Sequence, residues 1–271
     1  MSTTTLTPER VLDGTVDDHR EHAPIPATRL VAVELRKMFD TRSGFWLLAS
    51  VVITAVVATG AVVAFASPHS QTYETFAAAI GFPMSVILPV IAILSVTSEW
   101  SQRSGLTTFT LVPHRNRVVQ AKAVSTVAVG VVSMVVAFAV GALGNVAGTA
   151  IAGTPQVWDV SLQHALLIVL GNVLGMSMGF TLGVLVRNSA GAVVAYFVYA
   201  FVLPPLSGLL AAGQPWFRHL QGWVDFQYSA SLLFNGSLTS TDWAHVAVSG
   251  LVWLVTPLVV GVALVLRSEV A

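Results

Sequence analysis

The stretch Glu99-Trp-Ser-Gln-Arg-Ser-Gly-Leu-Thr-Thr-Phe-Thr-Leu-Val-Pro-His-Arg-Asn-Arg-Val-Val-Gln-Ala-Lys122 decides how this chain is organised, because it separates two long apolar runs. It is too rich in charge to lie in lipid. We therefore expect a loop outside the bilayer with a membrane span on each side. A long polar loop between spans is more often functional than idle, so we expect this one to bind another protein. Its basic residues are Arg103, Arg115, Arg117 and Lys122.

The composition indicates a polytopic membrane protein. Of the 271 residues 55% are hydrophobic and only 10% are charged, whereas soluble domains carry roughly a quarter charged residues. The absence of cysteine excludes disulfides, thiolate metal sites and a cysteine nucleophile. The first apolar run begins only at Phe45, behind a long charged segment. We therefore expect the first span itself, and not a cleaved signal peptide, to direct insertion.

Six apolar segments are each long enough to cross a bilayer. Each contains at least 20 largely apolar residues, which at about 1.5 Å per residue cover a hydrocarbon core of about 30 Å. The predicted fold is therefore an all-α membrane protein with six transmembrane helices. The predicted spans are 45–66, 76–98, 121–144, 162–186, 190–212 and 244–266.

The chain before the first span has two parts. Residues 1–28 combine acids, bases, histidines and prolines with few large apolar groups, which predicts a disordered tail. Residues 29–40 show a helical period, which predicts an amphipathic helix at the membrane surface. This helix is either a simple anchor or an elbow helix that contributes to a docking surface. Its apolar side carries Val31, Leu35, Met38 and Phe39, and its polar side Arg29, Arg36, Lys37 and Asp40.

The basic residues predict the orientation in the cell membrane. Of the thirteen Lys and Arg residues, all except Arg218 fall on one side of the predicted spans. By the positive-inside rule both termini are then cytoplasmic. The residues 29–271 are expected to form one membrane domain in contact with the lipid bilayer, and no nucleic-acid partner is expected.

Several classes of function lack the residues that they need. The six predicted spans contain no Asp, Glu, Lys or Arg away from their ends, which disfavours ion coupling and charged selectivity rings. The two lysines, Lys37 and Lys122, do not follow the glycine that a phosphate-binding loop requires. The histidines show no spacing typical of metal ligands, so we expect no metal site. If ATP drives this protein, another chain must bind it.

Small residues and prolines indicate how the helices pack. The fourth span carries a glycine at every fourth position, at Gly171, Gly175, Gly179 and Gly183. Small residues at this spacing permit the close approach of another helix, either within the subunit or at a dimer seam. Prolines can kink the spans that contain them. They lie at Pro83, Pro89, Pro204, Pro205 and Pro257.

One pattern resembles the rhomboid intramembrane proteases. Gly175-Met-Ser177-Met-Gly179 has the form Gly-x-Ser-x-Gly in the fourth of six spans, and His245 opens the sixth. However, Ser177 lies about 22 Å along its helix, while His245 lies at the outer end of its own. A nucleophile and its base need contact at about 3 Å. A serine protease is therefore only an alternative, and we assign no catalytic residue.

The segment 213–243 is the longest one predicted outside the membrane on the side opposite the termini. It is dense in aromatic residues, including Trp216, Phe217 and Trp223. Such residues are typical of an interfacial belt at headgroup level. A substrate gate is the other interpretation.

With these residues in view, the chain resembles the membrane permease subunits of type-2 ABC exporters. The resemblance covers the chain from about Arg29: a surface helix with Leu35, Arg36 and Lys37, six spans, and a polar segment between spans two and three. The matching residues of that segment are Ser98-Glu99, Arg103, Thr107-Thr108, Leu111, Pro113, Arg115, Arg117 and Ala121-Lys122.

The resemblance implies a half-transporter. It would pair with a second permease subunit and with two ABC ATPase subunits, which would bind the ATP and Mg, while this chain holds no cofactor. A coupling helix within 99–122 would dock on the ATPase beside the elbow helix. The residues expected at that contact are Glu99, Arg103, Thr107, Thr108, Pro113, Arg115, Arg117 and Lys122. An uncharged bundle suits hydrophobic or amphipathic cargo. A membrane sensor or scaffold without transport remains the third alternative.

Overall fold

The computed structural model describes residues 26–101 and 115–267. Over these residues the chain is helical and contains no strand, and six helices are long and apolar enough to cross a membrane. The prediction of six spans is therefore confirmed. The long helices are α1 (Ala27–Asp40), α2 (Arg42–Phe65), α3 (Tyr73–Ser101), α5 (Arg115–Ala152), α6 (Leu162–Val186), α7 (Ser189–Phe197), α8 (Leu203–Gly213), α9 (Pro215–Val224), α11 (Ser240–Gly250) and α12 (Thr256–Arg267). The shorter elements are η1 (Pro68–Ser70), η2 (Val198–Val202), α10 (Phe226–Ser231), η3 (Leu232–Asn235) and η4 (Leu251–Val255).

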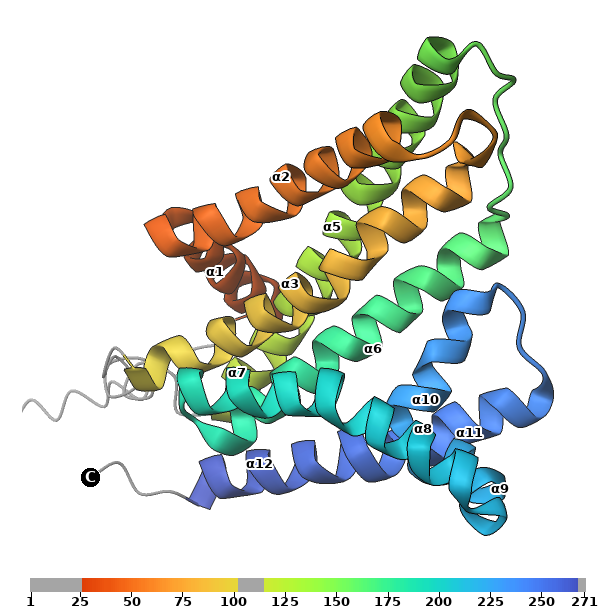
Figure 1. Cartoon of the computed structure of the whole chain (residues 1–271). Helices are drawn as coiled ribbons and strands as arrows, with labels where there is room; N and C mark the ends of the chain where they lie inside the picture. The colour runs from red at the N-terminus through yellow and green to blue at the C-terminus, as the bar shows by residue number, and fades with distance from the viewer. Residues whose placement is uncertain (1–25, 102–114, 268–271) are drawn as a thin grey trace, which may run out of the picture.

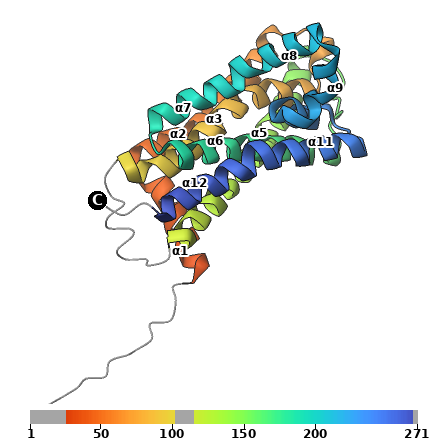
Figure 2. The ribbon, with the colours of Figure 1, turned by 90° about the horizontal axis from the view of Figure 1, so that it is seen from below.

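The spans alternate in direction, so the described turns fall at two ends of the bundle. α1, the last turn of α3, the first turn of α5 and the end of α12 lie at one end (Figure 1). The turns that follow α2, α5 and α8 lie at the other. A view from below again places α1 at the end where α12 finishes (Figure 2). We call these the inner and the outer end, following the charge bias of the sequence.

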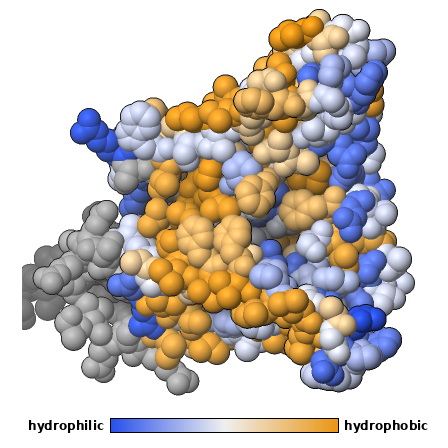
Figure 3. Space-filling view, in the orientation of Figure 1, coloured by the Kyte–Doolittle hydropathy of each residue, from blue (hydrophilic) through white to orange (hydrophobic). Residues whose placement is uncertain are grey.

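The surface matches a protein surrounded by lipid. Apolar side chains cover the broad middle of the face in Figure 3, and polar side chains gather along its right-hand edge, at the outer end. The exposed apolar residues include Val57, Phe65, Leu206 and Leu209. Such a surface is stable next to acyl chains and would be an aggregation hazard in water.

The third span is much longer than the prediction of 121–144, because α5 contains 38 residues from Arg115 to Ala152. Residues 145–152, which follow the predicted span, continue the helix. Asn145 is fully buried and its amide donates to the Val157 carbonyl at 3.1 Å. Gly148 lies so close to Gln71 that a Cβ there would meet Gln71 Oε1 at 2.6 Å. The small residues thus serve close packing of α5, and not a turn.

Two hydrophobic clusters share α3 and α6. The first joins α2, α3, α5 and α6 around Met84, Leu88 and Met176. The second joins α3 and α6 to α7, α10 and α11 around Ile93 and Tyr196. The helix pair α3 and α6 is therefore the centre of the bundle.

The proline in the middle of α3 has a specific partner. Pro89 has no N–H, so the carbonyl of Ser85 loses its helical hydrogen bond. The buried hydroxyl of Tyr196, on α7, donates to this carbonyl at 2.6 Å. On the other side α6 approaches so closely that a Cβ on Gly179 would meet Pro89 O at 2.5 Å. The irregular point of α3 is thus supported by both neighbours.

The fifth and sixth spans each contain one π-helical turn. η2 lies directly before Pro204 and Pro205, and η4 before Pro257. A π-turn widens the helix where a proline ring would otherwise clash with a carbonyl. At η4 the Thr256 hydroxyl also donates to the Leu251 carbonyl at 2.8 Å. The predicted kinks in these spans thus take the form of π-turns.

The outer segment 213–243 forms short helices. α9 exposes Trp216, Leu220 and Trp223, which agrees with an interfacial belt. Arg218, the single basic residue predicted at this end, donates to the carbonyls of Ala211 at 3.0 Å and Ala212 at 3.2 Å. It therefore satisfies carbonyl groups in the last turn of α8.

Candidate functional site

The candidate site is a buried polar cluster at the inner end, where α1 packs on α5 and where Lys122 of α5 also reaches α3. Its centre is an ion pair between Glu34 of α1 and Lys122 of α5, with 2.6 Å between Glu34 Oε2 and Lys122 Nζ. These side chains are only 9% and 8% exposed. Lys37 pairs with the other carboxylate oxygen at 2.7 Å, and is 46% exposed. One carboxylate therefore joins a buried and an accessible ammonium group.

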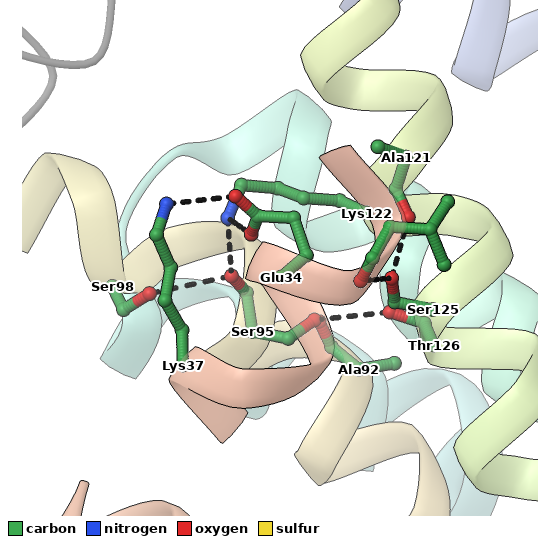
Figure 4. A network of polar contacts seen from close by, with 10 residues as sticks. Glu34, Lys37, Ala92, Ser95, Ser98, Ala121, Lys122, Ser125 and Thr126 are labelled. Carbon is green, nitrogen blue, oxygen red and sulfur yellow. Dashed lines mark hydrogen bonds and ion pairs between the residues drawn. The ribbon is translucent and has the colours of Figure 1, made fainter. Parts of the chain in front are cut away.

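Hydroxyl and carbonyl groups extend the cluster (Figure 4). Lys122 Nζ also donates to the Ser95 carbonyl of α3 at 3.4 Å. The Ser95 and Thr126 hydroxyl oxygens are 3.2 Å apart, which links α3 to α5. Ser125, which is 1% exposed, donates to the Ala121 carbonyl of its own helix at 2.8 Å, and its hydroxyl lies 3.3 Å from the Val31 carbonyl of α1. The cluster thus fixes α1 against the two spans that flank residues 102–114.

Electrostatics keep Glu34 ionised. Burial alone would raise the pKa of this carboxyl, but the ammonium groups of Lys122 and Lys37 outweigh burial and hold the pKa below its usual value of 4.5. A buried pair of this kind contributes little net stability over an apolar contact, but the loss of one partner leaves an uncompensated charge. The pair therefore specifies where α1 docks.

The segment predicted to bind an ATPase lies partly outside the described residues, which omit Arg103, Thr107, Thr108 and Pro113. Glu99 is in the last turn of α3, and Arg115 is the first residue of α5. Both helices therefore run continuously from this segment into the bundle. Arg117 follows in the first turn of α5 and is half-buried.

Lys122 has a different place from the one expected on a docking surface. Its ammonium lies inside the chain, between α1, α3 and α5. Sequence reasoning missed its partner, Glu34. A signal was available, because Glu34 falls three residues after Val31 and four before Met38, on the apolar side of the predicted surface helix. An acid on an apolar face indicates a buried partner.

Residues 29–40 are helical as predicted, within α1, and the polar side of this helix is exposed. Arg36 pairs with Asp40 at 2.9 Å, and these side chains are 81% and 62% exposed. Leu35 is half-buried. Phe39, on the apolar side of the same helix, is 56% exposed.

The glycines of α6 mostly permit contacts within the chain. A Cβ on Gly171 would meet Phe234 at 2.8 Å, and one on Gly183 would meet Ile93 at 3.4 Å. Gly179 is held against Pro89, whereas a Cβ on Gly175 would meet nothing within 4 Å. Positions four apart turn by about 40° on a helix, so the row drifts past different neighbours. The row is thus not one continuous seam.

The residues of the protease alternative have other partners. Ser177 donates to the Val173 carbonyl of its own helix at 2.7 Å. The ring of His245 stacks edge-on against Trp223, with 4.5 Å between centroids. No hydrogen bond joins the two residues. Among the described residues there is also no group of three or more His, Asp or Glu residues that could hold a metal ion.

Comparison with protein-family models and with curated proteins finds no match to this chain. A functional assignment therefore depends on the residues and their geometry.

Proposed function

We propose that this chain is the membrane permease subunit of an ATP-driven exporter of the ABC type. It would span the cell membrane with both termini in the cytoplasm, pair with a second permease subunit, and be moved by separate ATPase subunits that bind ATP and Mg. The observation that carries the proposal is the buried ion pair of α1 with the inner end of α5, which Lys122 extends to the inner end of α3. α3 and α5 are the helices that border the segment 102–114, which contains Arg103.

The geometry supports the transmission of force from that segment. α3 and α5 contain 29 and 38 residues, and helices of this length extend about 43 and 57 Å. The ion pair ties α1 to α5, and Lys122 also donates to the Ser95 carbonyl of α3, so a partner bound at the inner end would displace α1, α3 and α5 together. A rigid tilt of this kind is how closed and open states of transporters commonly interconvert.

The fifth span supports a partner in the membrane. Only 11% of the residues in its most apolar stretch are buried within the chain, whereas 50% are buried in the corresponding stretch of α6. Phe197, Phe201, Leu206 and Leu209 are among its exposed residues. This face is available to lipid or to a second permease subunit. The lack of charge within the spans supports a hydrophobic or amphipathic cargo.

The test is co-expression with an ABC ATPase encoded in a neighbouring reading frame. Replacement of both Arg103 and Arg117 by Glu should abolish co-purification of the ATPase and the stimulation of its ATP hydrolysis. Arg218→Glu is the matched control, since it reverses a charge at the outer end and should leave coupling intact. Unchanged coupling in the double variant would refute the proposal.

A further inference from the structure

A pocket of about 310 Å³ opens at the outer end, away from the inner cluster. α3, α6 and the α10–η3 segment form its walls. The start of α3 and the start of α6 lie side by side at this end (Figure 1). The His164 ring holds the third wall in place, because its Nε2 lies 2.9 Å from the Phe234 carbonyl oxygen.

The part of the pocket wall formed by α3, α6 and Phe234 is largely apolar and leaves open space. Ala77, Ala78 and Gly81 of α3 leave space that larger side chains would fill, and Phe82, Ile168 and Phe234 add apolar surface. A Cβ on Gly81 would meet no atom within 4 Å. The volume lies at the low end of the range for small-molecule sites. This part suits an aromatic or aliphatic body.

The polar groups of the pocket are mainly acceptors. Glu74 is its one charged lining residue, and no Lys or Arg lines it. The hydroxyl of Ser85 donates to the Phe82 carbonyl at 2.7 Å, so its oxygen can only accept from a ligand. The Nε2 hydrogen of His164 is likewise used, since its partner is a carbonyl. Gln227 also lines the pocket, and its neutral amide can donate or accept. A ligand would therefore meet one carboxylate, a hydroxyl acceptor and one neutral amide, with no cationic group.

A second carboxylate strengthens this charge. Asp159 Oδ1 accepts a hydrogen bond from the Glu74 backbone N–H at 2.7 Å, so its charge lies next to Glu74. Phe82 and Phe234 are 69% and 38% exposed. Aromatic faces attract cations, and the attraction grows where water is partly excluded.

From these features we propose that the outer pocket binds an amphipathic organic cation, with its apolar body between α3 and α6 and its ammonium group beside Glu74. The proposal deepens the proposed function by naming a class of cargo, and it rests on that function only for the transport of the ligand. Binding is a property of this chain alone.

The test uses two soluble probes of similar shape and opposite charge, benzyltrimethylammonium and benzylsulfonate. Equilibrium dialysis against the purified chain in a non-ionic detergent gives their dissociation constants. We expect the cation to bind and the sulfonate to bind at least tenfold more weakly. Glu74→Gln should weaken binding of the cation about twofold to fivefold, as expected for an exposed carboxylate. Asp40→Asn, an acid at the inner end, should change nothing.

A second variant tests the apolar part of the pocket independently of the Glu74 charge. Gly81→Phe adds a ring where the helix has open space, so the fold should persist while cation binding falls below detection. Equal affinity for the two probes, an unchanged constant in Glu74→Gln, or binding that survives Gly81→Phe would each overturn the proposal. No ATPase is present in these measurements, so their failure would leave the coupling test unaffected, and a failure of coupling would leave binding intact.

Discussion

Removal of the carboxylate in Glu34→Gln should detach α1 from the bundle. The change removes one ion pair from each lysine: Lys37 is already 46% exposed and can be solvated, whereas the 8% exposed Lys122 ammonium loses a pair at 2.6 Å. Breaking a buried pair costs about 3–5 kcal/mol. We take the lower end, about 3 kcal/mol, because Lys122 keeps the Ser95 carbonyl. The population of the open state should then rise roughly 100-fold.

The chain contains no cysteine, so one introduced thiol reports this opening. Ser125 lies under α1 at 1% exposure, and Ser125→Cys should react with a maleimide only when α1 moves away. The labelling rate in detergent should rise roughly 100-fold when Glu34→Gln is added.

The matched control is Asp40→Asn on the same helix. It breaks the pair with Arg36, whose side chains are 81% and 62% exposed. An exposed pair contributes about 0–1 kcal/mol, so labelling should rise no more than about fivefold. Replacement of both Glu34 and Lys122 by Leu should restore protection, because an apolar contact of similar volume substitutes for the pair. Equal labelling in Glu34→Gln and Asp40→Asn would refute the reasoning.

Three further outcomes are expected. The pKa of Glu34 is lowered below 4.5, so the docking of α1 should be constant with pH from neutral down to about 4.5. It should weaken as the pH falls further, through the pKa of Glu34 in the folded protein, and maleimide labelling of Ser125→Cys would report this change. Gly179→Ala should lower the thermal midpoint in detergent and the stability of the fold by about 1–3 kcal/mol, since its Cβ would lie 2.5 Å from a carbonyl oxygen. Its control is Gly175→Ala, which has open space around the new Cβ and should be neutral or stabilising. Tyr196→Phe leaves the Ser85 carbonyl without its donor and should cost about 1–3 kcal/mol by the same measurement.

The apolar length of each segment was enough to predict six spans, because a bilayer imposes one requirement on all of them. The same rule failed at the outer end of α5. There Gly148 looks like a turn residue in isolation, whereas its small size is needed for contact with Gln71. Tertiary packing decides between these roles, and a single sequence does not show the neighbour.

The inner site shows the same limit. The pattern of residues 29–40 predicted a surface helix, and its exposed pair agrees with that prediction. Glu34 and Lys122 are 88 residues apart in the chain, so no local pattern joins them. The outer pocket was also not foreseen, since it forms only where η3 folds back on α6.

α3 connects the two ends of the molecule. It contributes Ser95 to the inner cluster and Glu74 to the outer pocket, and the helical rise from Glu74 to Ser95 is about 32 Å. A proline without support would let the helix bend at the freed carbonyl, and a displacement at one end would then not reach the other. Here Tyr196 replaces the missing donor, and Gly179 brings α6 against the same point.

The support at Pro89 has a consequence for motion. α3, α6 and α7 should move as one body, since bending α3 alone would break the Tyr196 hydrogen bond in a medium that offers no water to replace it. Bending is then confined to the π-turns η2 and η4. Apart from α2, the two spans that contain these turns are the least buried within the chain. A displacement imposed on α1 at the inner end would therefore reach the walls of the outer pocket through α3, while η2 and η4 absorb the change in shape.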